Sequence, residues 1–186
     1  MREATHMILP LCERLVDPDA VSDELLRLRA ELDVLLEQRA HGVTRHVDVA
    51  ARIAGRLGEL HHGRGEAREA VTSFELSARL FHELRRSTPY LLACARAARA
   101  AGQLGAAEAR EAADALTALL DGDDDTIARI WRDRLLAWRA ECHAVAGDRD
   151  AARHDLEQAL AVRRLNPRDD TTLLEQGLAL LAPLRD

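Results

Sequence analysis

The chain has 186 residues, of which 32 are acidic and 26 basic, so its formal net charge at pH 7 is −6. Every basic residue is an arginine and only 3% of the residues are aromatic, so leucine and alanine must supply most of the packing. The acidic excess disfavours direct binding to nucleic acid, which needs a positive surface, and the 47% hydrophobic content excludes a disordered chain.

The cysteines are few, odd in number and far apart: Cys12, Cys94 and Cys142. This pattern fits neither a disulfide framework nor a thiolate metal site, and we expect a reducing, cytoplasmic setting. The apolar stretch at residues 7–12 is too short for a signal peptide or a membrane span. We therefore expect a soluble, unprocessed chain with no membrane partner.

Apolar residues recur with a period near 3.6 along the whole chain, and no segment alternates with the period of two that a strand needs. The sequence therefore predicts an all-α fold. Glycine, proline and aspartate indicate the helix boundaries, as at Asp17-Pro18, Gly42 and Asn166-Pro167. They predict helices at about 3–15, 19–40, 44–62, 66–86, 89–101, 106–120, 125–146, 149–163 and 169–183.

Three of the turns recur at nearly equal spacing. Their glycines, Gly65, Gly105 and Gly147, are 40 and 42 residues apart, and each precedes an alanine-rich helix. A period of about 40 residues built from two helices is typical of a solenoid, in which each repeat buries its apolar face against its neighbours.

Two segments resemble the tetratricopeptide repeat family. In residues 51–84 the family's Leu-Gly pair, turn glycine, small residue and large residue correspond to Leu57, Gly58, Gly65, Ala70 and Phe74. In residues 133–166 the corresponding positions hold Ala140, Gly147, Ala152, Leu156 and Ala159. Residues 91–120 depart from the pattern, since counting from Gly105 places Arg110 and Asp114 where apolar residues belong, and a slide of two residues restores Ala112 and Leu116.

The resemblance implies a right-handed α-solenoid that forms a single helical-repeat domain over residues 1–186. Its parts are an N-terminal hairpin at 1–42, repeats at 44–86, 89–120 and 125–165, and a capping helix at 169–184. A cap is expected because the last repeat of a solenoid needs its apolar face covered.

The sequence lacks a phosphate-binding loop, a nucleophile elbow, a metalloprotease motif and a Cys-x-x-Cys pair, so we expect neither catalysis nor a cofactor. His61 and His62 are adjacent and point about 100° apart on a helix, which argues against a shared metal ion. Two Arg-x4-His spacings resemble the HEPN family of helical ribonucleases, which stays a remote alternative because an arginine-rich chain produces such spacings by chance. They are Arg56 with His61, and Arg149 with His154.

By the same resemblance, the ligand-binding residues lie on the concave face formed by the first helix of each repeat. They are Arg52, Arg56, Glu59, His62, Arg96, Arg99, Arg134, Trp138 and Glu141. Arginine forks bind carboxylates and an indole supplies an anchor, so we expect a non-catalytic adaptor or regulatory module that binds an acidic or C-terminal protein segment. In bacteria, the family often serves such regulatory or peptide-sensing roles. The competing interpretation is a solvated face on which arginines pair with glutamates.

The predicted helix at 19–40 carries a heptad seam of Val21, Leu25, Leu28, Leu32 and Leu35, and Leu26, Val34 and Leu36 widen it. One interpretation is core packing against neighbouring helices. The alternative is self-association as a homodimer through this seam, which would make the chain a structural or oligomerisation module.

Overall fold

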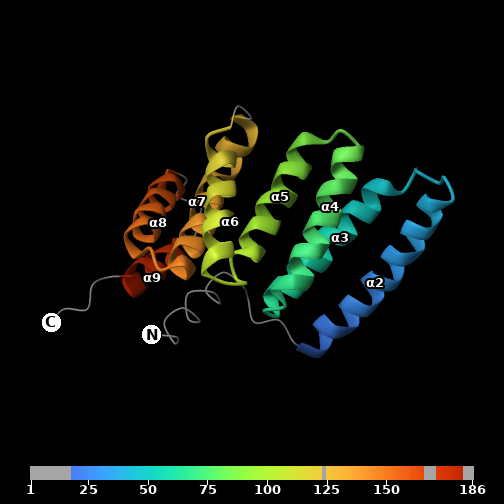
Figure 1. The fold of residues 1–186 in the computed structure, drawn as a ribbon, viewed down its shortest axis with the longest axis horizontal. Coiled ribbons are helices and arrows are strands. Elements are labelled where there is room, and N and C mark those ends of the chain that lie inside the picture. The colour runs from blue at the N-terminus through green and yellow to red at the C-terminus, as the bar shows by residue number, and fades with distance from the viewer. Residues whose placement is uncertain (1–17, 123–124, 166–170, 182–186) are drawn as a thin grey trace. The chain divides into compact units, whose positions relative to one another are not determined.

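The computed structural model describes residues 18–122, 125–165 and 171–181 (Figure 1). Within these ranges every regular element is an α-helix and no strand occurs, which confirms the all-α prediction. The helix predicted at 3–15 lies outside the described residues. None of the described helices has the length and apolar character that a membrane span requires.

The helix boundaries agree with the predicted ones to within three residues at either end. The helices are α2 (Pro18–Ala40), α3 (Val47–Gly63), α4 (Ala67–Glu83), α5 (Ser87–Ala101), α6 (Ala106–Leu120), α7 (Asp125–Ala146), α8 (Arg149–Arg164) and α9 (Thr172–Leu181).

The chain divides into two compact units. The N-terminal unit, residues 14–100, holds α2 to α5, and the C-terminal unit, from residue 101 onward, holds α6 to α9. The predicted repeat at 89–120 therefore has its first helix in one unit and its second helix in the other. The single helical-repeat domain stays a prediction.

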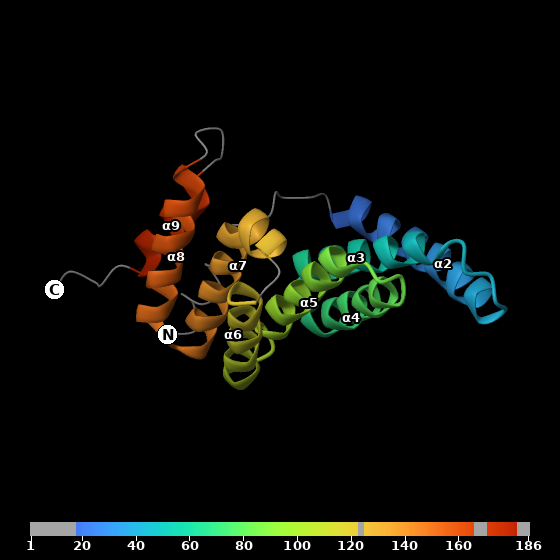
Figure 2. The ribbon, with the colours of Figure 1, turned by 90° about the horizontal axis from the view of Figure 1, so that it is seen from above.

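The N-terminal unit is built around α3, which α2 and α4 flank, with α5 beside α4 (Figures 1 and 2). Small residues on α3 let its neighbours pack on more than one side. The core holds side chains from three helices: Val21, Leu28 and Leu32 of α2, Val47, Ala50, Ala51, Ile53, Ala54, Leu57 and Leu60 of α3, and Leu80 and Phe81 of α4. Phe74 of α4 packs separately against Ala97 and Ala100 of α5.

Close contact between α3 and α4 depends on Gly58. A Cβ atom at this position would lie 2.6 Å from the Cδ1 and Cε1 atoms of Phe74, closer than carbon atoms can approach. One helical turn after Phe74 on α4, Ser77 donates a hydrogen bond of 2.8 Å from Oγ to the carbonyl oxygen of Ala51 on α3. Gly58 and Phe74, two positions of the repeat pattern, therefore lie in contact between α3 and α4.

Two of the recurring turn glycines have the left-handed backbone conformation that favours glycine. Gly65 has φ +74° and Gly147 has φ +89°, and both follow the end of a helix. Gly105 instead has φ 170°, which is extended backbone. The turn before α6 therefore differs in kind from the other two, at the place where the repeat register is irregular.

In the C-terminal unit α6, α7 and α8 pack in succession, and α9 packs against α8 (Figure 2). Asp148 begins α8 as its N-cap, since its carboxylate accepts a hydrogen bond of 3.0 Å from the backbone N–H of Ala151. On α9 the buried side is formed by Leu174, Gly177 and Leu181. A Cβ at Gly177 would stand 3.2 Å from Leu156 of α8, so α9 covers the apolar side of α8 closely.

Candidate functional site

A hollow of about 240 Å³ opens in the N-terminal unit, with walls supplied by three helices. Its lining residues are Ala51, Arg52, Gly55, Arg56 and Glu59 of α3, Phe74, Ser77 and Phe81 of α4, and Pro89, Leu92, Ala93 and Arg96 of α5. Four residues of the predicted groove therefore lie around one cavity: Arg52, Arg56, Glu59 and Arg96.

Small residues create this space, and apolar ones line much of it. Gly55 of α3 leaves room in front of Ser77, because a Cβ there would lie 3.3 Å from the Ser77 hydroxyl oxygen. Phe74 and Phe81 are buried, and Leu92 is half-buried. The hollow thus combines an apolar wall with charged side chains.

Asp48, near the start of α3, lies between two arginine side chains. Its Oδ2 atom is 2.8 Å from Nε of Arg52, one turn along α3, and its Oδ1 atom is 3.1 Å from Nη1 of Arg86. The Arg52 side chain is 67% exposed, so water competes for this ion pair. Arg52 is thus accessible to another carboxylate.

A second chain of ion pairs joins α2, α3 and α5. Arg56 donates from Nε and Nη2 to the two carboxylate oxygens of Glu24 at 2.9 and 3.2 Å, and its Nη1 lies 3.4 Å from Glu59. Glu59 in turn lies 3.0 Å from Nη2 of Arg96. The hydrogen bond from Arg56 is the main reason why the pKa of Glu24 is lowered, and the same bond raises the pKa of Arg56.

His62 and Arg99 were predicted in the same groove, but neither lines the hollow. His62 is 9% exposed, and burial, with a smaller effect from the charge of Arg99, lowers its pKa to about 3. At neutral pH its imidazole is therefore uncharged. In the structure, His62 is a buried packing residue and not a groove residue.

The other three predicted groove residues belong to α7 of the C-terminal unit. Arg134 is exposed, and its guanidinium carbon lies 4.5 Å from the ring centroid of Trp131. This is a cation–π contact. Trp138 and Glu141 are buried, at 9% and 8% exposure. A groove running through all nine residues stays a prediction.

The apolar seam of α2 faces the interior of the N-terminal unit. Val21, Leu28 and Leu32 belong to the core, and Leu25 and Leu35 pack against it. The packing interpretation is thus confirmed, with α3 as the neighbouring helix. Self-association through this seam would require exposing the core, because α3 already covers these side chains.

Neither Arg-x4-His pair forms a shared site. Arg56 binds Glu24, while Nδ1 of His61 lies 2.6 Å from Glu66. In the C-terminal unit Arg149 donates to the carbonyl oxygen of Leu180 at 3.3 Å, and His154 lies 2.7 Å from Gln158. Each arginine and histidine thus has a different partner.

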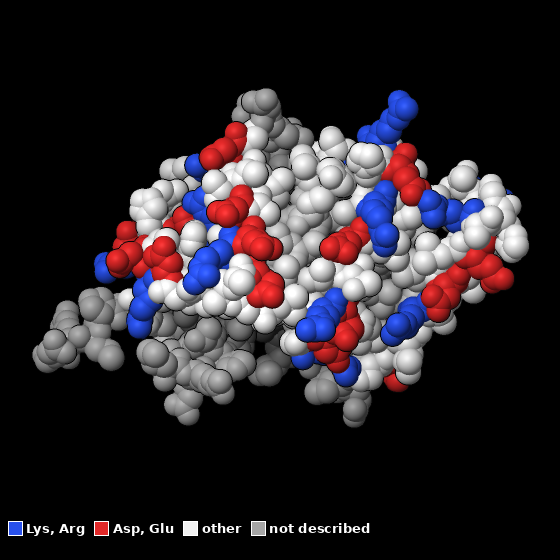
Figure 3. Space-filling view, viewed as in Figure 1, with Lys and Arg blue, Asp and Glu red and all other residues white. Residues whose placement is uncertain are grey.

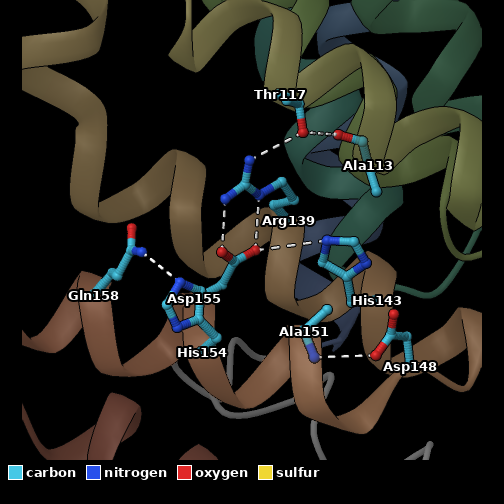
Figure 4. A network of polar contacts seen from close by, with 9 residues as sticks. All are labelled: Ala113, Thr117, Arg139, His143, Asp148, Ala151, His154, Asp155 and Gln158. Atoms are coloured by element: carbon cyan, nitrogen blue, oxygen red, sulfur yellow. Dashed lines mark hydrogen bonds and ion pairs between the residues drawn. The ribbon is translucent and has the colours of Figure 1, made fainter.

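A polar network in the C-terminal unit escaped the sequence analysis (Figure 4). Arg139 of α7 donates from Nε and Nη2 to the two oxygens of Asp155 of α8, both at 2.7 Å. Its Nη1 donates to Oγ1 of Thr117 of α6 at 3.0 Å, and Nε2 of His143 is 3.7 Å from Asp155. One guanidinium therefore links three helices.

Asp155 is 2% exposed, and its paired Arg139 is also largely covered. The bidentate hydrogen bond to Asp155 raises the pKa of Arg139, so this guanidinium stays charged. No pattern of nearby residues marks such a pair, because its members come from different helices. The one sequence signal for Asp155 is that an acidic residue lies on the apolar side of a predicted helix.

Among the described residues no group of three or more His, Cys, Asp or Glu side chains is arranged to hold a metal ion. Comparison with family models, with curated proteins and with solved structures finds no match to this chain.

Proposed function

We propose that this chain is a non-catalytic module that binds an acidic or C-terminal protein segment in the hollow of the N-terminal unit. The observation that carries the proposal is the meeting of Arg52, Arg56 and Arg96 around one cavity that also has an apolar wall. The repeat pattern predicts these three residues, together with six others, on one concave face. We propose binding and not catalysis, because the lining of the hollow accounts for recognition of a ligand without a reaction.

The chemistry of the hollow suits a short peptide motif in which an apolar side chain neighbours a carboxylate. A volume of about 240 Å³ is smaller than most small-molecule sites and suits a side chain inserted from a longer segment. The ligand carboxylate then replaces Asp48 or Glu59 as the partner of an arginine. Exposed ion pairs of this kind are worth about 0–1 kcal/mol, so the exchange costs little.

The proposal includes the fold implied by the repeat pattern, a right-handed α-solenoid of tetratricopeptide-like hairpins. Three observations support it: the contact of Gly58 with Phe74 between α3 and α4, the left-handed turn at Gly147 between α7 and α8, and the cover that α9 provides for α8. In such a fold the first helix of each hairpin presents residues to a ligand, which is the role proposed for α3.

The test is selection from a displayed library of random peptides, with both internal and free C-terminal formats, using the full chain as bait. We expect the selected peptides to share an Asp, Glu or terminal carboxylate next to a large apolar residue. Titration of a selected peptide should then give at least a roughly tenfold weaker affinity for Arg52→Gln/Arg96→Gln, because two charge-assisted hydrogen bonds are lost.

The matched control is Arg68→Gln/Arg79→Gln. Both arginines are exposed on α4, outside the hollow, and the substitution removes the same charge. Equal weakening by both double variants would show that only net charge matters and would contradict the proposal. Peptides without a carboxylate, or binding that neither variant alters, would also overturn it.

A further inference from the structure

The side of α2 that faces away from the core carries an apolar stripe. Leu26 is 70% exposed, Val34 is 52% exposed, and the exposed Ala30 lies midway between them. The three residues are four positions apart and therefore lie one turn apart on one face of the helix. This outer stripe is distinct from the core seam of the same helix and from the hollow.

Four charged residues flank the outer stripe in a regular order. Arg27 and Glu31 lie on one side of Ala30, and Arg29 and Asp33 lie on the other side, at roughly 60–100° from it around the helix. All four are exposed, and none makes a side-chain hydrogen bond or ion pair with another described residue. The charge of Arg27 also acts on Glu24 of the same helix, as one of the smaller causes of the lowered pKa of Glu24, but the exposed side chains of all four residues can reach a second molecule.

We infer that the outer stripe of α2 is a dimer interface in which a second copy of this chain packs antiparallel, with the two-fold axis passing at Ala30. In this arrangement Leu26 of each copy lies against Val34 of the other. The small side chain at Ala30 lets the two helices approach closely where they cross.

The charges select this orientation. A perpendicular two-fold axis keeps each flank on its own side, so Arg27 faces Glu31 of the second copy and Arg29 faces Asp33. The two-fold axis repeats each of these two contacts, so four ion pairs form between the two copies. A parallel pair would instead bring Arg27 to Arg29 and Glu31 to Asp33, so that like charges meet along both flanks.

The ends of the helix limit the strength of the contact. Asp23 and Glu37 each lie seven residues from Ala30, about 10 Å along the axis, and face one another between the copies. Crossing helices have begun to diverge there, so the repulsion is weak. One helix pair is smaller than a standard interface, and we expect a dissociation constant on the order of micromolar.

The experiment is sedimentation velocity of the full chain over a concentration series. The wild type should form a dimer, and Arg27→Glu or Glu31→Arg alone should weaken it by roughly tenfold or more, since each places two like-charge contacts in the interface. An equimolar mixture of these two variants should form a heterodimer. In it the new carboxylate at position 27 faces the new guanidinium at position 31, and the unaltered Arg27 faces the unaltered Glu31. The double variant Arg27→Glu/Glu31→Arg should restore the homodimer.

The control is the exposed pair Arg153 and Glu157 of α8, also four residues apart. Arg153→Glu and Glu157→Arg should leave dimerisation unchanged, and circular dichroism should show that all variants keep their helix content. A wild type that stays monomeric at all concentrations would overturn the inference. So would a dimer that survives both reversals, or a mixture that does not associate better than its components. Because no residue of the hollow is altered, these outcomes are independent of the proposed peptide binding.

Discussion

At the scale of single residues, Gly58 decides how closely α3 and α4 pack. Gly58→Ala would place a methyl group 2.6 Å from the Phe74 ring, forcing that ring or a helix to shift. We expect a loss of about 1–3 kcal/mol in the free energy of unfolding, despite the gain of about 1 kcal/mol that alanine brings to a helix interior. Urea denaturation measures the difference.

If contact with the Phe74 ring causes the loss of stability in Gly58→Ala, a smaller side chain at position 74 should reduce that loss. Gly58→Ala in a Phe74→Leu background should therefore cost less than it does in the wild type. Gly55→Ala, whose Cβ would meet only the Ser77 hydroxyl at 3.3 Å, should be the milder change. Equal costs at positions 55 and 58 would contradict this account.

His62 should make stability depend on pH. Its pKa in the folded state is about 3, so between pH 6.5 and about 3 the unfolded chain binds a proton that the folded chain does not. Stability is therefore full above pH 6.5 and falls as the pH falls below it. His62→Gln should reduce the slope between pH 6 and 4 by up to about 1.4 kcal/mol per pH unit, as measured by urea denaturation at each pH.

Above pH 7 the stability curves of the wild type and of His62→Gln should run parallel, since the imidazole is neutral in both the folded and the unfolded state there. An unchanged slope between pH 6 and 4 would show that His62 titrates alike in both states, and that its burial does not persist in solution.

At the scale of elements, the pair of Arg139 and Asp155 holds α6, α7 and α8 together. Arg139→Leu leaves the carboxylate of Asp155 buried, with Nε2 of the His143 imidazole 3.7 Å away. We expect a loss of about 3–5 kcal/mol on thermal or chemical unfolding of the full chain. Arg139→Leu/Asp155→Leu should recover much of that loss, because no charge is then left buried.

An exposed pair provides the comparison. Arg153→Ala should cost only about 0.3–0.5 kcal/mol, since its ion pair with Glu157 is half-exposed on one helix. If Arg139→Leu cost no more than this, or the double variant were less stable than Arg139→Leu, the buried pair would not be the element that links the three helices.

The helices themselves could be predicted from the sequence because their signals are local. Boundaries such as Gly42, Gly65 and Gly147 depend on a few neighbouring residues, and each of these glycines has the positive φ that such a turn needs. The charged side of the hollow was partly predictable, since Arg52 and Arg56 are one turn apart on α3. The pair of Arg139 and Asp155 was not, because two helices must pack before those residues meet.

The α2 seam shows a different limit. A stripe of leucines predicts that a helix buries one face, but it does not identify the surface that covers this face. The choice between α3 and a second copy depends on the alanine-rich surface of α3, which accommodates the seam at close range. Packing of this kind depends on the shapes of both helices, and one helix does not reveal it.

At the scale of the whole molecule, the arrangement of charges bears on which ligands the chain can bind. On the face seen in Figure 3, basic and acidic side chains lie next to one another instead of forming a patch of one sign. Recognition of an acidic segment by a chain of net charge −6 then depends on the few ångströms around each arginine. Physiological salt screens charges beyond about 8 Å, so the distant acidic residues oppose such binding only weakly.

The N-terminal unit contains its own core, and we expect it to fold alone. The buried cluster of α2, α3 and α4 lies wholly within residues 21–81, and the contact of Phe74 with Ala97 and Ala100 completes it on the α5 side. A fragment of residues 14–100 should therefore be helical and unfold cooperatively in a circular-dichroism melt. A shorter fragment, 14–86, loses the α5 cover of Phe74 and should melt at a lower temperature.

If the longer fragment were unfolded, the core of this unit would need residues from elsewhere in the chain, and the hollow would have to be studied in the full protein. If it folds, selected peptides should bind it as they bind the full chain, because every residue lining the hollow lies within it.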